Sequence, residues 1–223
     1  MAETSKATIT RTTAPSHPGI EEVRQWMETI DPEPEHEQQV TRIALMLFDK
    51  LQPIHGMARR ERELLEAAGL VHDLGMSISA KKHHKLSYDL VRSHRFLMWR
   101  PEEVELFALI ARYHRKAEPD MEHLPYAALP ERDRAAVRKL SAILRVSDGL
   151  DRAHLSTVQD IEASYDSNTV RLRLHAYRDC GTEIWGAERK ADVFERVFSR
   201  RLTIEACDGC CAGNSLAQES VNP

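Results

Sequence analysis

Histidine and aspartate side chains recur along this 223-residue chain at positions where they could bind a metal ion. The most informative pair is His72-Asp73, because an imidazole beside a carboxylate at the end of an apolar helical run can hold a divalent cation. One such pair alone is weak evidence for a metal site. It gains weight from further ligand-type residues on both sides of it, namely His36, His83, His84, His114 and Asp148.

Helical periodicity predicts that separate helices carry these residues toward one interior. His36 begins the apolar stripe of a helix expected from Glu35 to Leu51, and His72 closes the stripe of a second helix. Two further amphipathic stretches lead to His114 and Asp148. Taken singly, any of these histidines is more often a hydrogen-bonded core or surface residue. Because buried His and Asp are costly unless paired or bound to metal, their repeated inward placement indicates a metal centre.

The order of these residues resembles the HD superfamily of metal-dependent phosphohydrolases. More narrowly, the chain is similar to the C-terminal HD-like domain of the exopolyphosphatase and guanosine pentaphosphate phosphatase (Ppx/GppA) family. The similarity runs from about Glu35 to Ile204 and is carried by the stretches HEQQVTRIALMLFDKL, LLEAAGLVHDLGMSISAKKHHKLSYDLV, ALIARYHRKAEP and LSAILRVSDGLDRAH. In the full-length family the polyphosphate and nucleotide chemistry belongs to an N-terminal actin-like part. We therefore expect a stand-alone module whose own metal site is the working centre.

The resemblance implies one or two divalent metal ions, with His72 and Asp73 as the catalytic pair. A first metal would be held by His36, His72, Asp73 and Asp148, and a second by His114 with His83 or His84. Asp73 would bridge the two. Imidazole and carboxylate ligands without thiolate favour Mn, Fe, Co, Ni or Zn, and Mg is compatible if water completes its shell.

His83 and His84 are adjacent on a helix, so only one of them can point squarely at a given metal. We favour His83, because it stands four residues before the small residue Ser87, as the ligand does in the superfamily. His84 would then support His83 or contact a substrate phosphate, and the reverse assignment stays open.

The chemistry implied is hydrolysis of a phosphoester or phosphoanhydride bond by a metal-activated hydroxide. The substrate would be a small phosphorylated compound such as a nucleotide, an alarmone or a short polyphosphate. Cationic side chains near the proposed ligands are candidates for binding its phosphates, although most surface Lys and Arg are ordinary solvated charges. These candidates are Lys85, Arg112, Arg115, Lys116, Arg145 and Arg152, with Lys85 and Arg152 preferred.

A non-catalytic regulatory module that binds polyphosphate or nucleotides is the alternative function. The carboxylates Asp73 and Asp148 favour catalysis, because they would repel a polyanion unless metals neutralised them. Asp151 is expected to be an outer-shell group or a helix cap. The remaining histidines show no ligand pattern and are interpreted as surface or local structural residues, namely His17, His55, His94, His123, His154 and His175.

The expected fold is mainly α: a helical HD-type bundle over 20–155 that holds the metal site, and a small α+β appendage over 156–206. The appendage should contain short antiparallel strands and one helix, Glu183 to Arg200. Residues 1–19 are expected to be disordered, and 207–223 to form a flexible tail. The tail's three cysteines are better explained by an unstructured reduced segment than by a zinc site, since a fourth ligand is not evident.

Composition agrees with an ordinary globular protein, with 42% hydrophobic and 30% charged residues. A formal net charge of -4 argues against extended nucleic-acid binding, which usually needs a basic surface. The sequence contains neither an apolar run long enough to cross a bilayer nor the apolar core of a secretory signal near its start. We therefore expect a cytoplasmic protein without membrane contacts. The sequence is also compatible with a homodimer.

Overall fold

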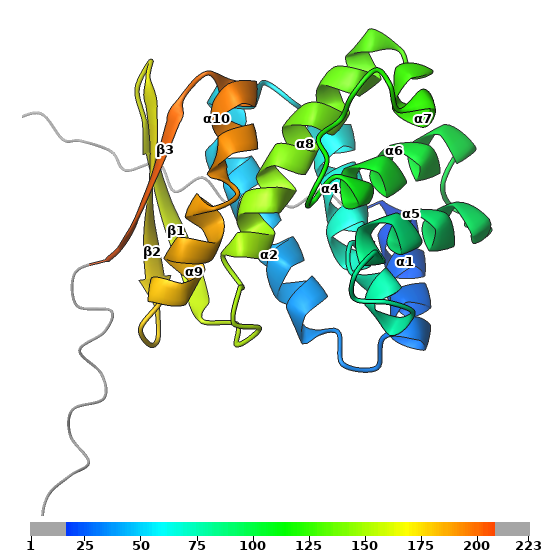
Figure 1. Ribbon diagram of the computed structural model, residues 1–223, viewed down its shortest axis with the longest axis horizontal. Coiled ribbons are helices and arrows are strands. Elements are labelled where there is room, and N and C mark those ends of the chain that lie inside the picture. The colour runs from blue at the N-terminus through cyan, green and yellow to red at the C-terminus, as the bar shows by residue number, and fades with distance from the viewer. Residues whose placement is uncertain (1–16, 208–223) are drawn as a thin grey trace, which may run out of the picture.

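The computed structural model describes residues 17–207 of the chain. Most of the expected disordered N-terminus and of the expected cysteine-containing tail lies outside these residues. Helices make up most of the described chain (Figure 1). They are α1 (Pro18–Ile30), α2 (Glu35–Lys50), α3 (Gln52–His55), α4 (Arg59–Val71), the 3-10 turn η1 (Leu74–Ser77), α5 (His83–Ser93), α6 (Pro101–Arg112), α7 (Leu124–Ala127), α8 (Glu131–Gly149), α9 (Gly181–Glu188) and α10 (Ala191–Phe198).

Helix α1 begins at Pro18, so the prediction of disorder up to Gly19 was wrong for its last residues. Two contacts of His17 explain the earlier start. Its Nδ1 accepts a hydrogen bond from the backbone N–H of Gly19 at 3.0 Å, and its ring stacks on Trp99. Proline at the first helical position also suits a helix start, because its fixed φ is helical and it needs no hydrogen-bond partner for an N–H.

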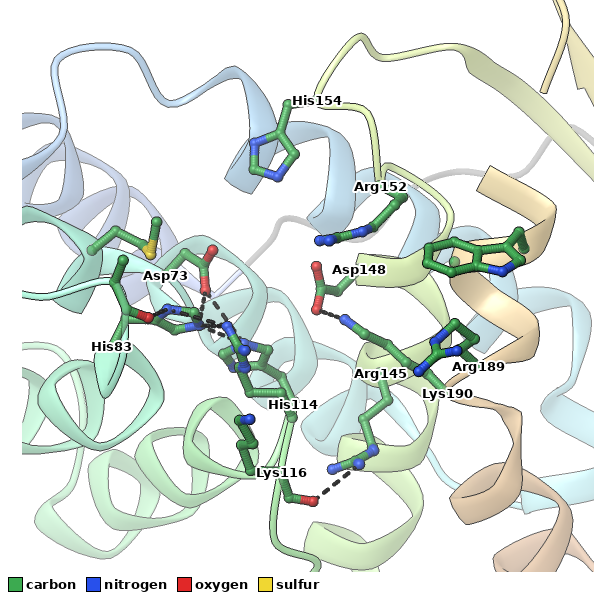
Figure 2. A pocket seen from close by; sticks show the side chains of 15 residues that line it. Asp73, His83, His114, Lys116, Arg145, Asp148, Arg152, His154, Arg189 and Lys190 are labelled. Atoms are coloured by element: carbon green, nitrogen blue, oxygen red, sulfur yellow. Dashed lines mark hydrogen bonds and ion pairs between the residues drawn. The ribbon is translucent and has the colours of Figure 1, made fainter. Parts of the chain in front are cut away.

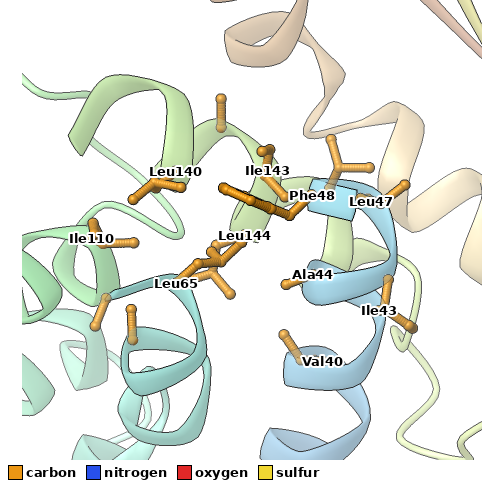
Figure 3. Close-up of a cluster of buried hydrophobic side chains, with 14 of the residues drawn as sticks. Val40, Ile43, Ala44, Leu47, Phe48, Leu65, Ile110, Leu140, Ile143 and Leu144 are labelled. Carbon is orange, nitrogen blue, oxygen red and sulfur yellow. The ribbon is translucent and has the colours of Figure 1, made fainter. Parts of the chain in front are cut away.

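The core lies between α2, α4, α6 and α8, which pack against one another (Figure 3). Each of these helices contributes an apolar stripe with the spacing of an amphipathic helix. Ala44, Leu65, Ile110, Leu140 and Leu144 from the four helices are completely buried and meet in this layer. The buried residues are therefore those that the helical periodicity predicted. His36, His72, His114 and Asp148 lie at or near the ends of the same apolar stripes.

The appendage contains a three-stranded sheet in the order β1-β2-β3, formed by β1 (Val158–Tyr165), β2 (Thr169–Ala176) and β3 (Arg201–Ala206). β1 and β2 form the expected antiparallel hairpin. β3 pairs with β2 in parallel, so the expectation of antiparallel strands throughout was wrong for this pair. The reason is the connection, because two helices lie between β2 and β3 and return the chain to the end of the sheet from which β2 starts.

The expected single helix from Glu183 to Arg200 is divided into α9 and α10. The division falls at Arg189 and Lys190, where Lys190 has φ −116° and ψ 1° and so leaves the α conformation. Both helices pack on α8, and both also contact β3. Lys190 is thereby placed at a bend beside the C-terminal end of α8.

The backbones of α8 and α9 touch directly. A Cβ atom added to Gly149 would lie 2.5 Å from the Cα of Ala187, and one added to Gly186 would lie 2.6 Å from the carbonyl oxygen of Gly149. Both distances are shorter than real Cβ contacts allow, so this close approach requires glycine at both positions. It joins the appendage to the core at the residue next to Asp148.

The predicted fold class is confirmed: a mainly helical bundle carries a small α+β appendage (Figure 1). None of the helices in the described part of the chain is long and apolar enough to span a membrane.

Candidate metal centre

Three histidines follow the same local pattern, in which the ring folds back onto the carbonyl three residues earlier. Nδ1 of His72 bonds to the Gly69 carbonyl at 2.8 Å, Nδ1 of His83 to that of Ala80 at 2.9 Å, and Nδ1 of His114 to that of Ala111 at 2.7 Å. A carbonyl can only accept, so each Nδ1 must carry the hydrogen. In the neutral ring Nε2 then keeps its lone pair, which is the form that binds a metal.

These Nε2 atoms meet around one carboxylate oxygen. Asp73 Oδ1 lies 3.1 Å from Nε2 of His83, 3.3 Å from Nε2 of His114 and 3.8 Å from Nε2 of His72. Arg115 donates to Nε2 of His83 at 3.0 Å, which agrees with an acceptor at that atom. Since four atoms with lone pairs face one another, the arrangement would be repulsive without a proton or a cation among them.

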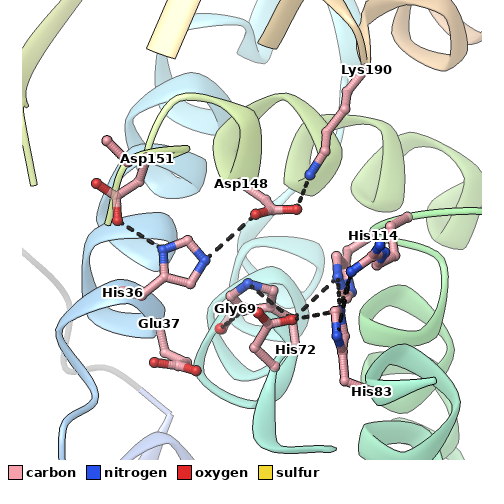
Figure 4. A network of polar contacts seen from close by, with 12 residues as sticks. His36, Glu37, Gly69, His72, His83, His114, Asp148, Asp151 and Lys190 are labelled. Carbon is pink, nitrogen blue, oxygen red and sulfur yellow. Dashed lines mark hydrogen bonds and ion pairs between the residues drawn. The ribbon is translucent and has the colours of Figure 1, made fainter. Parts of the chain in front are cut away.

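His36 reaches the same place from α2 (Figure 4). Its Nδ1 bonds to Oδ2 of Asp151 at 2.8 Å, and its Nε2 faces Oδ1 of Asp148 at 3.5 Å. Among residues 17–207, the buried atoms without a hydrogen-bond partner include His36 Nε2, His72 Nε2 and Asp73 Oδ1. Buried polar atoms are seldom left unsatisfied, so these atoms fit a bound cation.

The described residues contain two groups whose ligand atoms lie within 4.8 Å of one another, and Asp73 belongs to both. One group adds His36 and His72, and the other adds His83 and His114. These groups contain most of the ligands predicted from the sequence, and the second group contains His83 rather than His84. Asp148, which was predicted for the first metal, is not a member of either group. The donor set of imidazole and carboxylate suits transition-metal dications.

Buried charges shift the pKa values of the centre in the absence of metal. Burial lowers the pKa of His114 to about 3, so this ring is neutral and ready to bind. Burial also acts to lower the pKa of His36, but Asp148 and Asp151 outweigh it and raise that pKa to about 10. Burial opposes ionisation of Asp73, yet His72 and His114 hold its pKa below the usual value.

Asp148 lies at the edge of the centre and is shared between two partners. Its second carboxylate oxygen, Oδ2, forms an ion pair with Lys190, while Oδ1 faces His36 (Figure 4). Although burial acts to raise the pKa of Asp148, Lys190 and His36 hold it well below the usual value. Asp148 is therefore charged, and one oxygen remains directed to the metal-binding groups.

A cavity of about 420 Å³ opens onto this centre. Figure 2 shows Asp73, His83 and His114 on one side of it, facing Asp148 and a group of cations on the other. We call Arg152, Arg189 and Lys190 the cationic wall. The complete lining is Asp73, Met76, Ala80, His83, His114, Arg115, Lys116, Arg145, Asp148, Arg152, His154, Trp185, Gly186, Arg189 and Lys190.

The cations predicted from sequence divide into two sets. Arg115, Lys116, Arg145 and Arg152 line the cavity. Lys85 is exposed on α5 and Arg112 lies over the rings of Tyr88 and Tyr113, and the structure does not bring these two cations into the cavity lining.

Arg145 has a structural task, although it lines the cavity. Its guanidinium donates to the backbone carbonyls of Tyr113 at 2.9 Å and Lys116 at 3.2 Å. Lys116 has a positive φ of 60°, which is unfavourable for a residue other than glycine. Arg145 therefore supports the turn that presents His114, and its charge is partly committed to this role.

The structure separates His84 from the two ligand groups. Its ring centroid is 6.5 Å from that of His114, compared with 5.3 Å between the His83 and His114 rings. Burial is the main cause that lowers the pKa of His84 to about 4, and the neighbouring Arg115 adds to this effect. His83 is thus the residue that the α5 geometry directs at Asp73.

Sequence reasoning missed two contributors to the site and left a third undecided. Lys190 was not among the predicted cations, and His154 was interpreted as a surface or local structural residue. Asp151 was expected to be an outer-shell group or a helix cap, and its bond to His36 corresponds to the first of these roles. His154 in fact stacks on His36, with ring centroids 3.7 Å apart, and lines the cavity. The spacing of Asp151, three residues after Asp148 beyond a helix end, was the available signal for a supporting carboxylate.

The site thus combines clustered histidines and carboxylates with a cation-lined cavity in a helical domain. The family model for Ppx/GppA phosphatase, domain III, matches residues 20–182, which is more than half of the chain. The chain therefore belongs to the Ppx/GppA phosphatase family. No curated protein matches it. Lys190, α10 and β3 lie beyond the matched residues.

Proposed function

We propose that this protein is an HD-type, metal-dependent phosphohydrolase that cleaves a phosphoester or phosphoanhydride bond in a small phosphorylated compound. The observation that carries the proposal is the convergence of His72, His83 and His114 on Asp73 Oδ1, with each Nδ1 already committed to a carbonyl. Rings fixed in this tautomer are oriented in advance for metal binding. Family membership supports the phosphatase class.

The ligand groups suggest how two cations would be held. His36, His72 and Asp73 would bind one, with Asp148 Oδ1 beside them, and His83, His114 and Asp73 would bind the other. Divalent cations in such a site lower the pKa of a water molecule and neutralise the charge of an attacked phosphate. The protein's own part is to fix the imidazoles, exclude excess water and bring the phosphate to this end of the cavity.

The cationic wall supplies the complementary charge for a phosphorylated substrate. Arg152, Arg189 and Lys190 face the metal ligands across the cavity (Figure 2). A phosphate group between these sides would have its charge balanced from both directions. Arg115 and Lys116 add positive charge from the loop that carries His114.

The same wall supports the alternative function, a regulatory module that binds polyphosphate or nucleotides without cleaving them. Arginine and lysine side chains can hold a polyanion without catalysis. The two functions predict different fates for a bound phosphate compound: it is cleaved in the first and recovered intact in the second.

The test combines metal content with phosphate release. Protein purified without chelator should contain about one or two transition-metal ions per chain and release phosphate from a member of a panel of nucleotides, alarmones and polyphosphates. His72→Ala with Asp73→Ala should abolish both and leave the helical circular dichroism in place. The matched control, Asp89→Ala on α5 with His94→Ala at the residue that follows α5, should retain both. A metal-free wild type that binds but does not cleave the panel would support the regulatory module instead.

A further inference from the structure

The cavity is polar at its base but has two exposed apolar side chains in its lining. Trp185 on α9 is 52% exposed and Met76 on η1 is 46% exposed, and both belong to the lining. Exposing an indole to water forgoes the free energy that its burial would give. An inorganic phosphate chain has no apolar part that could cover these side chains.

The other two tryptophans of the chain are packed against neighbouring rings. Trp99 is buried and stacks on His17, and Trp26 stacks on His94 and meets Phe96 edge-on. Trp185 differs from them because its large planar surface is presented at a cavity rather than to the core. A ligand that enters the cavity and covers the indole would explain this exposed position.

The indole is held in a fixed relation to the metal ligands. The guanidinium of Arg189, one helical turn later, lies 5.1 Å from the centroid of the Trp185 ring. The residue after Trp185 is Gly186, whose backbone lies directly against Gly149 at the end of α8. Asp148 is the neighbour of Gly149, so α9 carries the indole at a set distance from the catalytic end of the cavity.

We infer that Trp185 is a stacking platform for a nucleobase and that the substrate is a nucleoside phosphate. The inference rests on the proposed phosphohydrolase function and names its substrate class. The base would lie on the indole, while the phosphates pass Arg152 and Lys190 of the cationic wall toward Asp73. A volume of about 420 Å³ falls in the range of small-ligand sites. Trp185 would thus select nucleotides over inorganic polyphosphate.

The test measures binding separately from turnover. Isothermal titration calorimetry of the Mn²⁺-loaded full chain is carried out with the β,γ-imido analogues of ATP and GTP, and with imidodiphosphate as the matched probe without a base. Trp185→Ala should weaken binding of the nucleotide analogues about tenfold, the size of effect expected for one lost base-stacking contact, and leave imidodiphosphate unchanged. Trp185→Phe should stay close to wild type, because it keeps an aromatic face.

Tyr165→Ala removes an exposed aromatic side chain at the end of β1 and serves as the control, with no change expected for any probe. Equal loss for imidodiphosphate and the nucleotides in Trp185→Ala would overturn the inference, and so would no loss for either. Base-dependent binding by a wild type that releases no phosphate would refute the hydrolase proposal while upholding the platform. Phosphate release from inorganic tripolyphosphate with no base-dependent binding would support the hydrolase proposal and refute the stacking platform.

Discussion

Asp151 Oδ2 accepts a hydrogen bond from Nδ1 of His36 at 2.8 Å across 115 residues of sequence. Asp151 is completely buried, and its other oxygen accepts from the backbone N–H of Ser156 at 2.9 Å. The carboxylate therefore fixes both the ring orientation of His36 and the tautomer that leaves Nε2 facing Asp148. Asp151 thus orients a histidine that we propose as a metal ligand, although Asp151 itself belongs to neither ligand group.

Replacing Asp151 should weaken metal binding without removing a ligand. Asp151→Ala is expected to lower Mn²⁺ affinity about 10- to 100-fold, the usual effect of losing a partner that orients a metal-binding histidine. Asp151→Asn should lose less, since its amide oxygen can still accept from Nδ1. Competition with a fluorescent chelator measures the affinity. Asp160→Ala, an exposed carboxylate on β1, is the control, and an equal loss in that variant would refute the role given to Asp151.

His83 and His84 are adjacent but should behave differently. His83→Ala removes a ring whose Nε2 is 3.1 Å from Asp73 Oδ1, so we expect the loss of about one metal ion per chain and of phosphate release. His84→Ala should keep the full metal content, because its ring lies outside both ligand groups. Mass spectrometry of the metal content decides between them. Loss of metal from His84→Ala alone would reverse the assignment.

Lys190 should affect metal and phosphate in opposite directions. Its ammonium forms an ion pair with Asp148 beside the place proposed for the cations. Lys190→Met removes a positive charge that repels a divalent ion. Mn²⁺ should then bind about tenfold more tightly, which is the order of magnitude expected when one charge is removed close to a bound ion. The same change should raise the KM for a phosphorylated substrate. Lys190→Arg, which keeps the charge, is the control; parallel weakening of metal and phosphate in Lys190→Met would contradict this account.

Metal affinity should rise with pH. Burial alone would lower the pKa of His36, but its two carboxylate partners raise it to about 10, so the metal-free ring carries a proton at neutral pH. That proton must leave before Nε2 can bind a metal. Affinity should therefore increase by up to about tenfold per pH unit below this pKa and level off above it. Calorimetry in buffers with different ionisation enthalpies counts the released protons; His36→Gln should release about one fewer, whereas an unchanged count would refute the coupling.

Sequence periodicity correctly predicted which residues of an individual helix face the interior. His36, His72 and Asp148 were placed on inward stripes correctly because residue type and the 3.6-residue repeat together determine which face is buried. The repeat cannot specify which of two neighbouring helical residues turns toward a neighbour. The distinction between His83 and His84 therefore required the packing of α5 against η1 and α6.

Features that depend on how distant segments pack were missed. Lys190 and Trp185 reach the cavity only because α9 lies against the end of α8, and a local pattern carries no information about that contact. The parallel pairing of β3 has the same origin. Conversely, Lys85 was favoured because it flanks the proposed second-metal histidines. It lies two residues after His83, a spacing that points the two side chains to different faces of a helix, and Lys85 is exposed to solvent.

The glycine contact between α8 and α9 leaves no side-chain layer between the two backbones. Helices separated by side chains can adjust by small rotamer changes, whereas two backbones in contact have almost no such freedom. Asp148 on one side and Trp185 with Lys190 on the other should therefore move as one body. The width of the cavity on this side is then a fixed dimension, so any opening needed for substrate entry must come from the opposite side, where η1 and the Met76 side chain form the border.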